Sequence, residues 1–492
     1  MTLSLLHRPN EVRRFLEACR TRRADVALIG DSNVFSAGDS GYALGWDAAW
    51  GRRFGHYATG VRSFRPGNAN FTLVYGGGMD GGGPAAGSVP AALAALVPDA
   101  AFGSGPTHAE AGPVNPNFNV DFALKASHPN GIKGPLRWAF SYGTFDSGAG
   151  QLAPIARAVA SLYYVGAATI PTNAGGVGTA VGALDLPADA GRTWDELWFA
   201  LGSVFGDAGE LRGPFLALWQ RVVFADRWAG VGVTPMLAQG GQPTRAAAAA
   251  LAGMTQGQFD EWARLVVGQQ GGTPVLMAQV LQGQNDTADA AASVGPRPAP
   301  GNTPAGVVDN TVAVVERLRA LWAGGGRDPD DLYVLVGPYH PQDESRRAWG
   351  RDLDDALRAY ADGERNVAVA SRSRVSTSAY VRHKGWYADG SDAHLSSAGY
   401  HGWAELAANA VAPAPAAVVR HATGAALDLR LFDAAGQVFD AARGSFGAWA
   451  DADQADYAIA GHELGGSGVY RFDLPPGLRG PAGLRGVVTA RA

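Results

Sequence analysis

A serine and a histidine near opposite ends of this 492-residue chain have surroundings typical of a nucleophile and its base. Ser32 stands in Gly30-Asp-Ser-Asn33, directly after an apolar run. A residue at the carboxyl end of a buried strand lies where open α/β sheets bind ligands. His394, in Asp389-Gly-Ser-Asp-Ala-His394, can accept the serine proton while a nearby carboxylate holds its tautomer. These residue types predict acyl transfer through a serine.

Two further segments supply hydrogen-bond donors of the kind that a developing oxyanion needs. They are Ala238-Gln-Gly-Gly241 and Gly283-Gln-Asn-Asp286, and each follows an expected strand. A glycine backbone N–H and a side-chain amide both stabilise negative charge on oxygen in a transition state. Taken alone, each segment is a common turn or helix cap. Their occurrence together at strand ends favours the catalytic interpretation.

The elements that must position these residues alternate between apolar strands and amphipathic helices. The expected strands are 24–30, 231–237, 273–281, 331–337 and 366–370. The expected helices are 11–23, 244–253, 307–322, 344–362 and 397–411. Such alternation predicts a parallel sheet covered on both faces, a doubly wound α/β fold.

The order Gly-Asp-Ser, Gly, Gly-x-Asn-Asp and His resembles the four sequence blocks of the SGNH (GDSL-type) hydrolase superfamily. The resemblance covers residues 24–56 and about 193–411. It implies a flavodoxin-like, five-stranded parallel sheet. It also implies that Ser32 is the nucleophile and that His394 is the general base.

The same resemblance assigns three donors to the oxyanion hole. The first is the backbone N–H of Ser32, and the third is the side-chain amide of Asn285. The second is the backbone N–H of Gly241, with Gly240 as the alternative because the Gly-Gly pair leaves the register open.

The acid of the implied triad departs from the family pattern. That pattern places an aspartate three residues before the histidine, where this chain has Ser391. Asp392 and Asp389 are the available carboxylates, and we expect Asp392 to orient His394 because it is nearer. The remaining alternative is a Ser–His dyad in which a backbone carbonyl orients the imidazole.

The chain between the first two expected strands differs from the rest in composition and in its hydrophobic pattern. Residues 57–192 are rich in glycine and contain short strand-like runs, which predicts an inserted β-sandwich. Residues 193–227 are aromatic, and we expect them to be helical and to lead back to the α/β domain. We therefore expect a discontinuous hydrolase domain over residues 1–56 and 193–411. After a Pro/Ala linker, residues 418–492 alternate like a small C-terminal β domain.

Composition excludes several classes of partner. Forty basic and 45 acidic side chains leave a net charge of −5, so there is no basic field for a nucleic acid or an anionic membrane. The single cysteine, Cys19, excludes an internal disulfide and any site with several cysteines. The spacing of His383, His394 and His401 does not match a metal motif. We therefore expect neither a metal nor another cofactor.

The apolar runs and the N-terminus indicate where in the cell the protein is located. No apolar run approaches the roughly 18–20 residues of a membrane span. The N-terminus lacks the features of a signal peptide, so we expect a cytoplasmic protein unless a leader was removed, in which case it is extracellular or periplasmic. The oligomeric state stays open.

The resemblance implies a carboxylic ester as substrate, and we expect O-acetyl groups on a carbohydrate. Aromatic residues of the insert either stack on sugar rings or form the sandwich core: Trp138, Tyr142, Tyr163 and Tyr164. One alternative is a general short-chain esterase or lipase. Another is a non-enzymatic, surface or virion-associated binding protein on a hydrolase scaffold.

Overall fold

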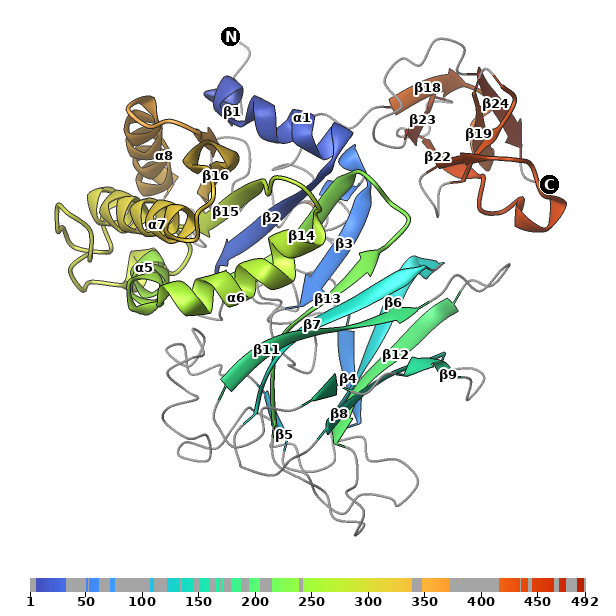
Figure 1. Cartoon of the computed structure of the whole chain (residues 1–492). Helices are drawn as coiled ribbons and strands as arrows, with labels where there is room; N and C mark the ends of the chain where they lie inside the picture. Colours follow the sequence, from blue (N-terminus) through green and yellow to red (C-terminus); the bar gives the residue numbers. More distant parts are fainter. Residues whose placement is uncertain are drawn as a thin grey trace.

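The architecture comprises three β-sheets, one of which is flanked by helices (Figure 1). The computed structural model describes residues 6–31, 50–51, 53–61, 71–75, 107–109, 122–132, 135–144, 151–158, 164–167, 170–171, 178–186, 194–203, 215–238, 242–338, 347–371, 384, 416–433, 435–440, 445–463, 469–474 and 485–490. The expected helix at 397–411 lies outside these residues.

The largest sheet contains a parallel core that confirms the predicted fold class. Its parallel strands are, in spatial order, β17 (Val367–Ala370), β16 (Leu332–Pro338), β15 (Leu276–Gln282), β2 (Arg23–Gly30), β14 (Gly230–Ala238) and β3 (His56–Val61). The five expected strands thus lie in the order 2-1-3-4-5, which is the flavodoxin-like order. Strand β3 adds a further parallel strand that we did not expect.

Both faces of this parallel core are covered, as the apolar strands require. The described α-helices are α1 (Arg13–Thr21), α5 (Thr244–Gly253), α6 (Gln256–Val266), α7 (Pro304–Gly324) and α8 (Arg347–Asp362). Leu276, Ala278 and Val280 of β15 share one buried cluster with residues of α5 to α8. The alternate residue Gln279 faces Trp50 on the other side, where Phe15 of α1 also packs against Tyr333. In Figure 1, α5, α6 and α7 lie in front of the sheet.

The short 3-10 helices lie in the connections of the described chain. They are η1 (Pro9–Val12), η3 (Val267–Gln269), η4 (Asp286–Ala288), η5 (Pro329–Asp331) and η8 (Asp451–Asp453). No described helix is both long enough and apolar enough to cross a membrane.

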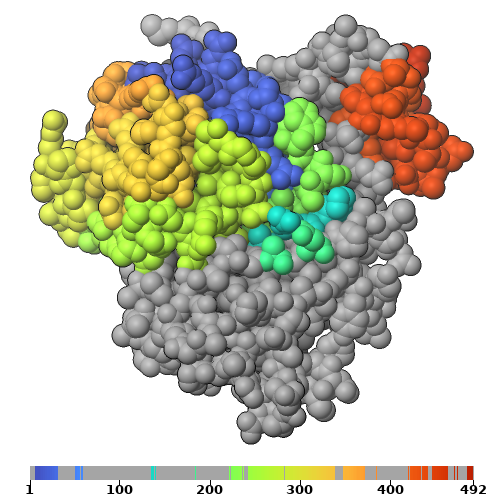
Figure 2. Space-filling model, in the orientation of Figure 1, coloured from blue at the N-terminus to red at the C-terminus, as the bar shows by residue number. Residues whose placement is uncertain are grey.

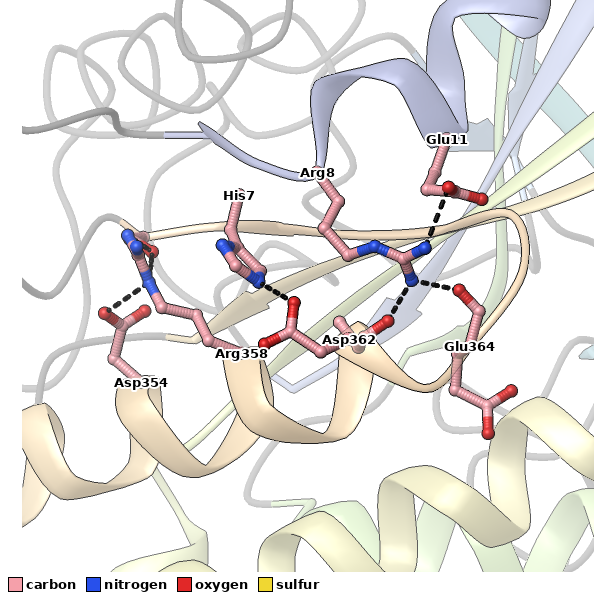
Figure 3. A network of polar contacts seen from close by, with 9 residues as sticks. His7, Arg8, Glu11, Asp354, Arg358, Asp362 and Glu364 are labelled. Atoms are coloured by element: carbon pink, nitrogen blue, oxygen red, sulfur yellow. Dashed lines mark hydrogen bonds and ion pairs between the residues drawn. The ribbon is translucent and has the colours of Figure 1, made fainter.

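The N-terminal segment is held against α8 by polar contacts (Figure 3). Strand β1 (Leu6–His7) pairs antiparallel with β17, and His7 bonds to Asp362 through Nε2 at 2.7 Å. Arg8 donates to the Glu11 carboxylate at 2.8 Å and to the backbone oxygen of Glu364. These contacts anchor the edge of the sheet at the strand that precedes the expected His394 loop.

The parallel core continues into antiparallel strands on the side of β3. These are β13 (Phe215–Phe224), β7 (Leu136–Thr144) and β11 (Gly178–Leu186), with β5 (Thr107–Ala109) paired to β13. The expectation of helix over residues 193–227 is therefore wrong. Aromatic and β-branched residues are frequent in this segment, and pairing with neighbouring strands overrides a weak helical period.

A second, antiparallel sheet lies in the lower part of Figure 1. It contains β10 (Ile170–Pro171), β8 (Gln151–Ala158), β12 (Trp194–Ser203), β6 (Phe122–Ile132) and β4 (Phe71–Tyr75), with β9 (Tyr164–Ala167) paired to β8. Strand β11 of the first sheet lies against β8 and β9. The division at residues 57 and 192 stays a prediction, because strand pairing does not show which segments fold independently.

The third sheet is built by the C-terminal segment, coloured orange to red in Figure 2. Its seven strands are β18 (Ala416–Arg420), β23 (Val469–Asp473), β22 (Ile459–Glu463), β19 (Leu427–Phe432), β20 (Val438–Asp440), β21 (Ser445–Gly447) and β24 (Arg485–Ala490). Leu427, Leu429 and Leu431 form the centre of a separate buried cluster. We refer to this segment as the C-terminal module.

A buried polar network joins the parallel core to the antiparallel strands. Asp25 of β2 forms an ion pair with Arg221 of β13, and both side chains are fully buried. Tyr57 of β3 donates to Asp25 and accepts from the Arg221 guanidinium at 2.8 Å. Gln270 donates to Asp25 at 2.6 Å. A Cβ atom at position 232 would collide with the Arg221 guanidinium, so Gly232 is required there.

Candidate active site

Asn285 brings together three segments at the carboxyl ends of the parallel strands. It lies just after β15, where Gly283 adopts a φ of 111° that glycine tolerates. The Asn285 Nδ2 donates to the Asp31 carboxylate at 3.2 Å and to the backbone oxygen of Gln242 at 3.4 Å. Asp31 follows β2, and Gln242 precedes α5. The two partners of Asn285 are thus the chain neighbours of Ser32 and Gly241.

The other predicted site residues lie outside the described part of the chain. They are Ser32, Gly240, Gly241, Asp389, Asp392 and His394. Their roles stay predictions. The structure places the third sequence block directly, and it places the first and second only through the residues adjacent to them.

Asp286 ties the Asn285 turn to the start of α5. Its carboxylate is buried and accepts hydrogen bonds from Thr244 N at 2.9 Å, from Thr244 Oγ1 at 3.0 Å and from Gly283 N at 3.0 Å. Thr244 is the first residue of α5. A carboxylate at a helix N-terminus satisfies an N–H that has no partner within the helix. Asp286 thereby sets the position of the start of α5 relative to the Asn285 turn.

Burial makes the charge on this carboxylate costly. Desolvation raises the pKa of Asp286 to about 6, although the hydrogen bonds from Thr244 and Gly283 act in the opposite direction. Arg245 and Asp289 form a second connection between the same elements, with Nε to Oδ2 at 2.8 Å and a second guanidinium bond at 3.2 Å. The two connections hold the Asn285 turn on both sides.

Trp50 anchors the far end of the segment that contains Ser32. The indole Nε1 donates to Gln279 Oε1 of β15 at 3.1 Å, and both side chains are buried. The Trp50 ring also stacks on Phe54, with ring centroids 6.0 Å apart. Asp31 therefore lies beside Asn285, and Trp50 lies against Gln279 of β15.

Sequence reasoning missed the positioning roles of Asp31 and Asp286. Both residues belong to quoted blocks, Gly30-Asp-Ser and Gly283-Gln-Asn-Asp286, so the signal was present in the motifs. Nothing local in the sequence shows that Asp31 meets Asn285 or that Asp286 meets Thr244, because these contacts join distant segments.

Other candidate groups were also sought in the described chain. Within it, no three His, Cys, Asp or Glu side chains are grouped to hold a metal ion. Cys19 is buried, and its burial raises the pKa of the thiol well above the usual value, which disfavours a reactive thiolate. The expectations for the aromatic side chains of the insert and for His383 and His401 lie outside what the structure describes.

Comparison with known proteins gives matches at the level of three-dimensional structure only. Neither the protein-family models nor the curated protein sequences match this chain. A peptidoglycan O-acetylesterase is 11% identical, and the match covers 83% of this chain and 98% of that protein with a TM-score of 0.48. The acetyl xylan esterase Est2A of Butyrivibrio proteoclasticus is 9% identical over 59% of this chain and 90% of its own, with a TM-score of 0.24.

A family two carbohydrate esterase from Clostridium thermocellum, solved with cellohexaose, is also similar. It is 8% identical, and the match covers 62% of this chain and 93% of that protein with a TM-score of 0.23. The three matches share a low sequence identity, and each covers more than half of this chain.

Proposed function

We propose that this protein is a serine esterase that removes short acyl groups, chiefly O-acetyl groups, from a carbohydrate. The observation that carries the proposal is the position of Asn285. Its amide contacts the chain neighbours of Ser32 and Gly241 at the edge of the sheet where ligands bind. This position supports the proposal of an oxyanion hole with donors from three segments.

In the proposed reaction, His394 takes the proton of the Ser32 hydroxyl while the Ser32 oxygen attacks the ester carbonyl. The resulting oxyanion accepts from the backbone N–H groups of Ser32 and Gly241 and from the amide of Asn285. As the tetrahedral intermediate collapses, the bond to the sugar oxygen breaks, and His394 returns the proton to that oxygen. Water, deprotonated by His394, then hydrolyses the acyl-enzyme on Ser32.

Asp392 is proposed to orient His394 and to stabilise the imidazolium. No metal or cofactor enters these steps, because the serine and histidine provide the nucleophile and the proton transfer. Asn285 donates to the Asp31 carboxylate and to the Gln242 oxygen, and these two acceptors fix its amide, which supports a preorganised donor that needs no reorganisation at the moment of reaction.

The test compares the full chain with its Ser32→Ala variant on acetylated xylan, on O-acetylated peptidoglycan and on p-nitrophenyl esters of increasing acyl length. We expect acetate release from an acetylated glycan and faster cleavage of p-nitrophenyl acetate than of the octanoate. Both activities, and labelling by a fluorophosphonate, should disappear in the Ser32→Ala variant while circular dichroism stays unchanged.

Each other result points to a different function. A preference for the octanoate would indicate a lipase-like enzyme. Hydrolysis of small esters without any glycan activity would indicate a general short-chain esterase. A folded protein that cleaves no ester and takes no label would contradict the enzyme proposal and favour a binding protein. Label that persists in the alanine variant would exclude Ser32 as the nucleophile.

A further inference from the structure

The C-terminal module carries an aromatic residue on its outer face. Leu429 and Leu431 of β19 are 3% exposed and point into the core. Because side chains alternate along a strand, Phe432 points to the opposite face. Arg485 lies directly across from Phe432 on β24, and its guanidinium carbon is 5.5 Å from the centre of the phenyl ring. This cation–π contact holds the half-buried Phe432 ring against the exposed Arg485 side chain.

Trp449 extends the same surface with a second, nearly parallel ring. The Trp449 and Phe432 rings are inclined by 18°, and their centroids are 6.3 Å apart. The buried Tyr457 supports the indole at 5.2 Å, and the indole N–H donates to Asp451 Oδ1 at 2.8 Å. Trp449 nevertheless stays 42% exposed. The ring is thus held in one orientation while much of it faces solvent.

We propose that Phe432, Trp449 and Arg485, here named the aromatic platform, bind a sugar ring of a neutral polysaccharide. The C–H face of a sugar ring is apolar and fits the negative face of an aromatic ring, while its hydroxyl groups need polar partners at the rim. The Asp451 carboxylate supplies acceptors there, since the indole occupies only one of about four acceptor positions. The Arg485 guanidinium supplies donors.

The charge around the platform argues against a polyanion. Asp451, Asp453 and Asp456 follow Trp449 closely in the chain, and they outnumber Arg485, the cation of the platform. Carboxylates at this density repel an anionic membrane or a nucleic acid.

The exposed apolar area argues against a stable protein interface. Among the described residues of the C-terminal module, the large apolar side chains that are exposed are Trp449 and Val487. Two side chains fall far below the area of about 800 Å² that each partner of a standard interface buries.

The platform belongs to a different sheet from Asn285, and binding there does not depend on the proposed hydrolysis. The experiment therefore uses the Ser32→Ala chain as background, so that no acetyl group is removed during the measurement. Binding to insoluble xylan, cellulose and chitin is measured by depletion from solution over a range of glycan concentrations. Retention of at least one of these glycans is expected.

In that background, Trp449→Ala should raise the Kd for the retained glycan about tenfold or more, a loss of ~1.4 kcal/mol. Trp449→Tyr keeps a flat ring and should stay within about threefold of the parent. The matched control is Trp228→Ala, because Trp228 is 74% exposed but lies outside the C-terminal module. This control should bind as the parent does.

Thermal melting shows whether each variant is folded, and the Trp449→Tyr result separates stacking from folding. Three results would overturn the proposal: no retention of any of the three glycans, equal losses for the Trp449 and Trp228 alanine variants, or retention on anionic phosphatidylserine vesicles in place of glycan. Esterase activity of the Ser32 parent with p-nitrophenyl acetate is measured separately, so failure of one proposal does not decide the other.

Discussion

The side-chain amide of Asn285 donates a hydrogen bond to the carboxylate of Asp31 across 254 residues of chain. A primary amide has two N–H donors, and this bond orients both of them. The second contact, to the Gln242 oxygen, is long at 3.4 Å and therefore weak. A negatively charged oxygen is a stronger acceptor than a distant carbonyl. In the proposed reaction, the oxyanion would therefore replace the Gln242 oxygen as acceptor, while the bond to Asp31 keeps the amide in place.

Replacing Asn285 by alanine should lower kcat by roughly 10²–10³, as the loss of a single oxyanion donor does elsewhere. KM should change little, because the bond strengthens only in the transition state. Steady-state kinetics on p-nitrophenyl acetate measure both parameters. A loss confined to KM would show instead that Asn285 binds the ground-state substrate.

The role of Asp31 is tested by a double-mutant cycle with the same substrate. If Asp31 acts through Asn285, then Asp31→Ala should lower kcat on its own but should add nothing to the Asn285→Ala variant. Losses that multiply would mean that the two residues act independently. Asp330→Ala is the matched control, because Asp330 pairs with Arg365 just before β16, at the opposite end of the parallel strands, and should leave kcat within a few fold.

Asp286 should make the stability of the protein depend on pH in a defined range. Burial raises its pKa to about 6 in the folded state, against about 3.9 in an unfolded chain. Well below pH 4 the carboxyl is protonated in both states, and its contribution is complete. As pH rises, the unfolded chain releases the proton first, so folding free energy is lost, and the loss reaches roughly 3 kcal/mol well above pH 6.

Urea unfolding of the parent and of Asp286→Asn at pH 4, 5, 6 and 7 measures this contribution. The asparagine variant has no carboxyl to titrate at this position, so the stability advantage of the parent should shrink by roughly 2 kcal/mol between pH 4 and pH 7. A constant difference would show that the pKa of Asp286 is not raised. The comparison cancels other groups that titrate near pH 6 in both proteins.

The choice between Asp392 and Asp389 is tested by their asparagine variants. If Asp392 orients His394, then Asp392→Asn should lower kcat by up to roughly 10⁴, because the imidazolium loses its charge partner and the tautomer is no longer held. Asp389→Asn should then be nearly silent. The measurement is kcat at saturating substrate over several pH values.

Two other outcomes would reject Asp392 as the triad acid. If both variants lose less than about tenfold, a backbone carbonyl orients His394 and the site is a dyad. If Asp389→Asn is severe and Asp392→Asn is mild, then the acid lies five residues before the histidine. In that case the intervening residues must loop out.

The buried pair of Asp25 and Arg221 should be far more sensitive than an exposed pair on the same sheet. Arg221→Leu leaves the Asp25 charge without its cation in a fully buried site and should cost about 3–5 kcal/mol of unfolding free energy. Arg137→Leu removes the exposed pair with Asp185 and should cost less than about 1 kcal/mol. Equal losses of unfolding free energy for the two variants, measured with urea, would mean that water reaches the Asp25–Arg221 network.

Much of the α/β core follows from the local pattern of the sequence. Strand β2 illustrates this, since every residue from Ala24 to Gly30 is buried, as its apolar run predicts. The five expected strands and helices α1, α5, α7 and α8 occur within a few residues of their predicted bounds, whereas helix α6 was not predicted. A strand that is buried on both faces is apolar along its whole length, and an amphipathic helix repeats its apolar residues at the helical period. These local patterns identify the strands and helices without knowledge of what packs against them.

Only the tertiary structure decided which segments meet. Residues 215–224 form a strand because β3 and β7 lie on either side of them, and no local period could reveal those partners. Likewise, Asp31 and Asp286 occur within recognisable motifs, but their contacts with Asn285 and Thr244 join elements that are distant in the chain. A hydrogen bond depends on the distance and angle between two groups in space, which sequence spacing does not contain once the chain folds back on itself.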